Sequence, residues 1–166
     1  MNAVVKVSKH LIPFERIALV EPFVMPEEPP FASTKDFKAR ILLLDKMSVL
    51  TEETPEALAE VNGFNMIMPD RVATSPAVQF GVEAFAPVEN FQPSKPYQSR
   101  LTWRDADGNA QSKLLLADPD VVLAIAVRGE PAIAGQAPTT AGKQVRNKRP
   151  RTGRRRQFRK ASAELT

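Results

Sequence analysis

Proline is spread along this whole chain, and its positions limit the secondary structure that can form. The sequence has 15 prolines in 166 residues, about twice the usual share. A proline inside a helix costs roughly 3 kcal/mol, because it lacks an N–H group and clashes with the preceding turn. Long helices are therefore disfavoured, and short strands joined by turns are favoured. Met25–Pro30 is predicted to be an extended loop, because successive prolines hold the backbone near the polyproline conformation.

Alternating apolar and polar residues predict several half-buried strands. A β-like stretch covers Ile12–Val24, before the proline-rich loop. In Phe37–Leu44 and again in Ala77–Phe85, every second residue is apolar and the residues between them are partly charged. Each run therefore predicts a strand with one face on the core.

A β-hairpin is predicted after these strands. The run Tyr97–Arg104 alternates, reaches a glycine-containing turn at residues 105–109, and continues into Ala110–Leu116. The alternation places Tyr97 and Trp103 on the same face as Leu101. We therefore expect both aromatic rings to lie in the core, and the alternative role as a stacking platform for bases is the less favoured one.

Capping signals predict two short helices. Thr54 precedes a proline at the first helical position, and Gly63 stands just past the end of the segment. The same punctuation brackets Asp118 to Gly129. The interior of the second segment is apolar on all sides and rich in β-branched residues, so a buried strand is the alternative there.

These elements predict an α+β, mainly β fold. We expect a small antiparallel sheet or a partly open barrel with one or two short helices, followed by a disordered basic C-terminal tail. Residues 1–130 would form the folded domain, and residues 131–142 a linker of mainly Ala, Pro, Gly and Thr. Residues 143–166 would form the Arg-rich tail, whose like charges and few apolar residues predict disorder when it is alone.

Charge is divided unevenly between the two ends of the chain. Residues 143–166 contain ten Lys and Arg and one acid, Glu164, which gives a net charge of +9. Residues 1–142 contain the other thirteen basic residues and eighteen acids, which gives −5. A mildly acidic domain with a strongly basic tail indicates that the tail binds a polyanion.

The composition of the tail favours phosphate as the ligand. Seven of its ten basic residues are Arg, and a guanidinium group can donate two parallel hydrogen bonds to a phosphate. An acidic protein partner is the alternative, and a solubilising tail without a partner is a further one. The tail residues predicted to contact nucleic acid are Lys143, Arg146, Lys148, Arg149, Arg151, Arg154, Arg155, Arg156, Arg159 and Lys160.

A second basic surface is predicted on the hairpin. Arg100 and Arg104 fall on the face opposite Trp103, with Lys113 expected beside them on the next strand. Aligned cations on a sheet surface are one way in which single-stranded nucleic acid is held. A solvated strand face is the alternative interpretation of these two arginines, and the favoured one.

Signatures of catalysis and of metal binding are weak in this sequence. There is no cysteine, and His10 is the single histidine, so the common nucleophile–base pairs would need His10. The turn that starts at Asp105 has Ala110 and Leu116 where a calcium loop of the EF-hand type needs Gly and Glu. We expect no enzyme, no metal and no cofactor.

We expect no signal peptide at the N-terminus, because no basic start followed by a long apolar stretch is present. The longest apolar runs, Ile41–Leu44 and Val121–Val127, are too short to span a membrane. We expect a cytoplasmic protein without a membrane partner, associated with the nucleoid in a bacterium or nuclear in a eukaryote.

Three functions are compatible with these observations. The leading hypothesis is a nucleic-acid-binding accessory protein, with a single-strand-binding, regulatory or packaging role, anchored to DNA or RNA by its tail. The second is a structural or assembly protein whose β domain forms a homo-oligomer and whose tail neutralises a packaged genome or ribosomal RNA. The third is a protein-interaction adaptor whose tail docks an acidic partner. The first predicts a monomer or dimer, and the second a large oligomer.

Overall fold

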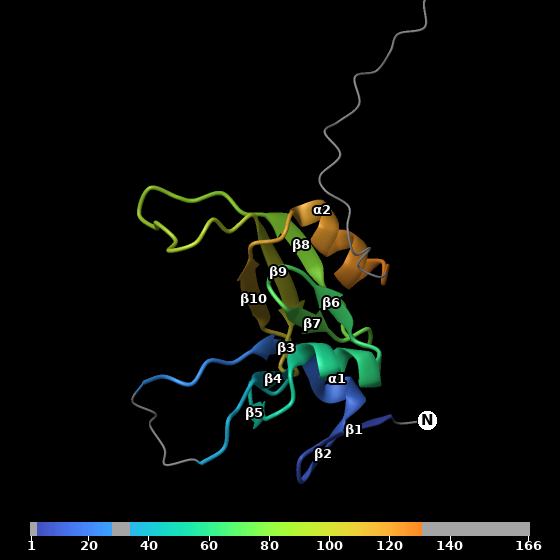
Figure 1. Ribbon diagram of the computed structural model, residues 1–166. Coiled ribbons are helices and arrows are strands. Elements are labelled where there is room, and N and C mark those ends of the chain that lie inside the picture. The colour runs from blue at the N-terminus through green and yellow to red at the C-terminus, as the bar shows by residue number, and fades with distance from the viewer. Residues whose placement is uncertain (1–2, 28–33, 131–166) are drawn as a thin grey trace, which may run out of the picture. The chain divides into compact units, whose positions relative to one another are not determined.

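Short antiparallel strands make up most of the regular secondary structure in the computed structural model, which describes residues 3–27 and 34–130 (Figure 1). The predicted linker and tail lie outside the described residues. The largest sheet has five antiparallel strands. Their order across the sheet is β5 (Ser48–Thr51), β4 (Ala39–Leu43), β3 (Ile17–Pro22), β7 (Val72–Thr74) and β6 (Asn65–Ile67).

Two smaller antiparallel sheets pack with it. The three-stranded sheet has the order β10 (Ala110–Leu115), β9 (Ser99–Arg104) and β8 (Gly81–Ala84). The N-terminal hairpin pairs β1 (Val4–Val7) with β2 (His10–Pro13), and the 3-10 turn Phe14–Arg16 leads from it into β3. The described strands therefore form small antiparallel sheets and no closed barrel.

The central strand β3 separates two hydrophobic cores. Ile17 and Val20 belong to one core, whereas Ala18 and Leu19 belong to the other. Strict alternation would put Ile17 and Leu19 on the same side, but the register with β4 shifts between these two residues. This bulge turns the strand locally, and it lets consecutive apolar residues serve opposite faces of the sheet.

The first core lies between the five-stranded and three-stranded sheets and includes Leu19, Leu101 and Trp103. The second core includes Val5, from β1, and Leu58. The helix α1 (Pro55–Asn62) packs against β3, β6 and β7 (Figure 1). The five-stranded sheet is therefore covered on both faces, which explains why β3 is buried along almost its whole length.

Both predicted helices are present. Ala57 donates its N–H to the Thr54 hydroxyl at the start of α1, and Gly63 ends the helix in the left-handed conformation with a φ of 72°. The second segment starts at the Asp118 cap as α2 (Pro119–Val122) and continues as a π-helical stretch, η2 (Leu123–Val127). α2 contacts β8 and β9 (Figure 1), and Val122, Ile125 and Ala126 are buried in the first core.

The strand predictions are confirmed in part. The predicted hairpin matches β9 and β10, and Phe37–Leu44 contains β4. The strand predicted over Ala77–Phe85 is shorter in the structure, because β8 begins only at Gly81 and turns precede it. The stretch Ile12–Val24 is interrupted by the 3-10 turn. The strands β1, β5, β6 and β7 were not predicted.

Candidate nucleic-acid interface

The two hairpin arginines lie where the alternation predicts. Leu101 and Trp103 are buried in the first core, whereas Arg100 and Arg104 on the same strand are exposed. The face of the three-stranded sheet that carries Arg100 and Arg104 is called the outer face here. The ten basic residues predicted in the tail lie outside the described residues, so the structure places only Arg100 and Arg104 of the predicted contacts.

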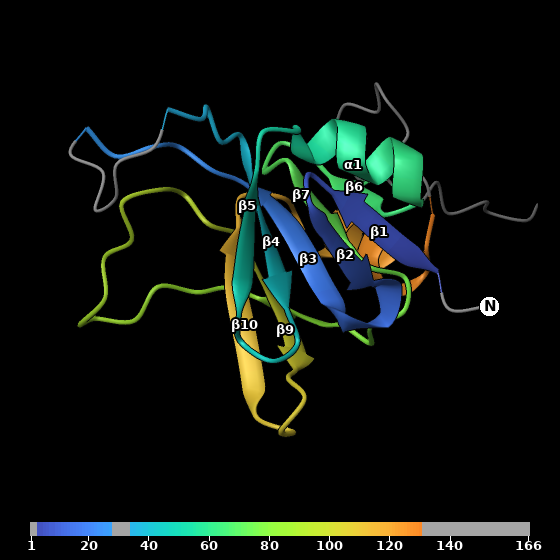
Figure 2. The same ribbon diagram turned by 90° about the horizontal axis from the view of Figure 1, so that it is seen from below.

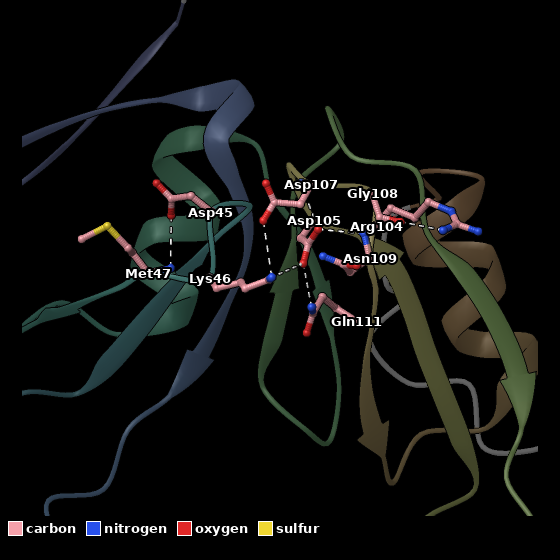
Figure 3. A network of polar contacts seen from close by, with 9 residues as sticks. All are labelled: Asp45, Lys46, Met47, Arg104, Asp105, Asp107, Gly108, Asn109 and Gln111. Carbon is pink, nitrogen blue, oxygen red and sulfur yellow. Dashed lines mark hydrogen bonds and ion pairs between the residues drawn. The ribbon is translucent and has the colours of Figure 1, made fainter.

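Polar contacts dock this sheet onto the five-stranded sheet at its turn. Ala106 donates its N–H to the Leu44 carbonyl at 2.8 Å. The Lys46 ammonium lies 3.3 Å from a carboxylate oxygen of Asp105 and 3.4 Å from one of Asp107. Figure 3 shows Lys46 reaching across from the β4–β5 turn to the β9–β10 turn. The orientation of the outer face is therefore set by contacts between two turns.

Asp105 is the centre of this network. Its side chain is only 1% exposed. One carboxylate oxygen accepts the N–H groups of Asp107 and Asn109, at 3.0 and 2.9 Å, and the other accepts the Gln111 amide at 2.8 Å (Figure 3). Burial alone would raise the pKa of Asp105, but the hydrogen bonds and Lys46 outweigh it and lower that pKa to about 2. The carboxylate is therefore a structural anchor of the turn.

Arg104 is tied to the same turn. Its guanidinium group donates to the Gly108 carbonyl at 2.7 Å (Figure 3). Beside it lies a cleft of about 540 Å³, lined partly by Phe80, Gly81 and Thr102. Among the described residues that line this cleft, Arg104 is the only charged one. The cleft can take an apolar or anionic group next to one cation, but its lining holds no nucleophile paired with a base.

Lys113 does not lie beside these arginines, and the prediction for it was wrong. In the observed register Lys113 pairs with Leu101, so it shares the inward face of the sheet. Its ammonium forms an ion pair with Glu21, a β3 residue whose side chain is only 5% exposed. Arg40 on β4 binds the other oxygen of the same carboxylate, with its Nε at 2.6 Å. Lys113 therefore links the two sheets and is not part of the outer face.

Tyr97 also differs from its prediction. It precedes β9, lies outside both cores and is half-buried. Its ring packs edge-on against Phe85, with 6.4 Å between the centroids, and Phe85 packs in the same way against Phe91 at 6.2 Å. Trp103 is in the first core as predicted, 6.0 Å from Phe80. Of the two rings expected in the core, only Trp103 is there.

The aromatic group joins the outer face through Arg100. The guanidinium carbon of Arg100 lies 5.7 Å from the centroid of Phe85, which is within the range of a cation–π contact. Phe85 and Phe91 were missed as site residues. Alternation puts Phe85 on the same face as Glu83, but only the observed pairing of Glu83 with Arg100 brings Phe85 near that arginine. Nothing in the sequence pattern marked Phe91, which lies in the loop beyond the strand.

Features of other functional classes are sparse in the described residues. His10 lies exposed on β2, opposite Val7. Within residues 3–27 and 34–130, no group of three or more acidic or histidine side chains is arranged to hold a metal ion. None of the helices in that part of the chain is long and apolar enough to cross a membrane. Comparison with protein-family models, with curated proteins and with solved structures finds no significant match to this chain.

Proposed function

We propose that this protein is a nucleic-acid-binding accessory protein, anchored to phosphates by its Arg-rich C-terminal tail. The observation that carries the proposal is the division of charge, with +9 on residues 143–166 and −5 on residues 1–142. Each phosphate that the tail neutralises releases counterions, so such a tail supplies affinity without reading sequence.

The folded domain contributes little attraction of its own. On the outer face, Arg100 and Arg104 are accompanied by Glu83, and Arg104 is already bound to the Gly108 carbonyl. Lys113, which we predicted to lie on this face, forms an ion pair with Glu21 instead. We therefore assign most of the affinity to the tail, and to the domain a role in positioning or discrimination.

The proposal is tested by titrating labelled single-stranded DNA, duplex DNA and RNA with two forms of the protein. One form is the full chain, and the other ends at Gly142. We expect the full chain to bind with a salt dependence that corresponds to about six to ten phosphates, and the shortened form to lose this binding. Binding of both forms with equal affinity would contradict the role of the tail.

A third form separates charge from chain length. In it Arg154, Arg155 and Arg156 are each replaced by Gln, so the tail keeps its length and loses three charges. We expect the salt dependence to fall by about three phosphates for duplex DNA. If the full chain binds no nucleic acid near physiological salt, the proposal fails, and an acidic protein becomes the favoured partner.

A further inference from the structure

We propose that Phe85, Phe91 and Tyr97, together with Arg100, form a platform on which unpaired bases of single-stranded nucleic acid stack. These four residues are called the aromatic platform. The inference rests on the proposed function and deepens it, because it places the discrimination between single and double strands on the folded domain. The affinity would still come from the tail.

The three rings of the platform belong to neither core. Phe85, Phe91 and Tyr97 are absent from both buried clusters, and Phe91 is 46% exposed. Phe91 and Tyr97 each pack edge-on against Phe85, at centroid distances of 6.2 and 6.4 Å. Aromatic side chains that serve only to fill a core are buried in it. Three rings gathered at the surface next to an arginine therefore indicate a binding surface.

Backbone hydrogen bonds order parts of the loop that carries the rings. Residues 85–98 connect β8 to β9 and project from the sheet in both views (Figures 1 and 2). Phe85 donates its N–H to the Gln98 carbonyl at 2.9 Å, which extends the β8–β9 ladder to the base of the loop. Further along, Phe91 donates to the Val88 carbonyl at 2.9 Å and Tyr97 to that of Lys95 at 2.8 Å.

Prolines add to this order. Pro87, Pro93 and Pro96 lie in the same loop, and each fixes one backbone dihedral angle. A loop that is already ordered loses less conformational entropy when it binds, so more of the contact energy appears as affinity. We therefore expect the rings to lose little conformational freedom when they bind.

Single-stranded nucleic acid has the chemistry that these side chains can bind. A base offers a flat π-face that stacks on an aromatic ring irrespective of its identity, and the backbone beside each base carries a negative charge. The guanidinium of Arg100 lies 5.7 Å from the Phe85 centroid. Lys95 lines a hollow of about 640 Å³ within the loop, together with Phe91, the acidic Glu89 and other residues. One cation thus lies over a ring and another beside Phe91, and because Glu83 and Glu89 lie near these cations, the platform supplies stacking and the tail supplies the charge.

Duplex nucleic acid fits this surface less well. Its bases are already stacked and paired, so a ring can reach one only after the base has been unstacked, which costs a few kcal/mol. The same reasoning separates the platform from the tail, because phosphates are available in single and double strands alike. Loss of the platform should therefore weaken single-strand binding selectively.

The test compares Phe91→Ala with two matched variants in the full-length protein. Phe91→Leu keeps most of the apolar surface but removes the π-face. Leu11→Ala removes an apolar side chain from β2 that is 71% exposed, against 46% for Phe91. The probes are an oligomer of deoxythymidine of about 15 nucleotides and a duplex of similar length. We expect Phe91→Ala and Phe91→Leu to weaken single-strand binding about tenfold. The same two variants should change duplex binding less than about twofold. Leu11→Ala should change neither single-strand nor duplex binding.

A fluorescent reporter tests the contact directly. Tyr97 is the single tyrosine and Trp103 the single tryptophan of the chain. A protein carrying Tyr97→Trp and Trp103→Phe therefore has its only indole in the platform, and we expect the single strand to quench its emission and the duplex to leave it unchanged. Normal circular dichroism of each variant shows that it is folded.

The outcomes separate this inference from the proposed function. If the full chain binds both probes and all variants match the parent protein, the platform is overturned and the tail remains the anchor. If the full chain binds neither probe, the proposed function fails and the platform fails with it. If a proline-rich peptide quenches the indole emission and the oligonucleotide does not, base stacking on the platform is overturned, and the platform is a peptide site.

Discussion

Glu21 is a charged residue in a buried position. It is a carboxylate on the central strand with a side chain only 5% exposed, and it is bound by Arg40 from β4 and by Lys113 from β10. The three side chains therefore tie the two sheets together through one buried charge. Breaking such a pair is costly because it leaves charges without a partner, even where the intact pair adds little stability.

We expect Glu21→Gln to lower the free energy of unfolding by about 2–3 kcal/mol. This is at or below the lower end of the range for buried pairs, because Arg40 and Lys113 keep 44% and 28% of their side chains exposed and can turn to water. Urea denaturation followed by circular dichroism measures the change. Glu56→Gln is the control, because Glu56 binds Arg71 at a site where both side chains are over 40% exposed, and such pairs contribute below about 1 kcal/mol. Equal losses in the two variants would contradict the role of burial.

Asp105 predicts a dependence of stability on acid pH. Its pKa in the folded protein is about 2, below the ordinary value of 3.8. A carboxylate with a lowered pKa adds stability above its unfolded pKa, and this stability is lost as pH falls from about 4 towards 2. We expect Asp105→Asn to be less stable than the parent protein at pH 7 and to lose less further stability over that window. Urea midpoints at pH 7, 4, 3 and 2 test this, and parallel curves for the two proteins would contradict it.

At the scale of elements, α1 depends on its caps. Thr54 accepts the N–H of Ala57 at 3.3 Å and satisfies a donor that the helix itself leaves free. We expect Thr54→Ala to lower the free energy of unfolding by about 1 kcal/mol. Val61→Ala, which removes an 82% exposed side chain from the same helix, should change it by less than about 0.5 kcal/mol. A thermal or urea midpoint for each variant is sufficient, and an unchanged midpoint for Thr54→Ala would contradict the contribution of the cap.

The elements that could be predicted are those whose signals are local. Thr54, Pro55 and Gly63 fix both ends of α1 by short-range hydrogen bonding and backbone conformation, and the turn at residues 105–109 fixes the hairpin. The strands β6 and β7 have only three residues each, which is too few for a period of two to be recognised. Their existence depends on the pairing of β7 with β3 and of β6 with β7, which local sequence does not specify.

The candidate site could be predicted only in part, because only some of its residues are placed by local signals. Alternation placed Arg100 and Arg104 correctly, because they share one strand with Leu101 and Trp103. Lys113 is on the partner strand, and its face depends on the register across the turn, which the pattern of one strand does not give. Tyr97 was misplaced because we extended the alternation to residues before Ser99, where β9 begins.

At the scale of the described domain, one strand joins the two hydrophobic cores. Leu19 and Val20 are adjacent on β3, and each is fully buried in a different core. Loss of packing in either core therefore removes support from the same strand, which lies in the middle of the five-stranded sheet. We infer that the domain unfolds as one cooperative unit and not core by core.

The single tryptophan makes this cooperativity measurable. Trp103 reports on the first core, whereas Leu58, only 3% exposed, belongs to the second. We expect Leu58→Ala to destabilise the domain by about 3 kcal/mol and to shift the unfolding midpoint of Trp103 fluorescence together with that of far-ultraviolet circular dichroism. Val61→Ala on the same helix should shift neither midpoint. If Leu58→Ala leaves the Trp103 transition in place while circular dichroism shows an earlier one, the second core unfolds separately, and β3 does not couple the two.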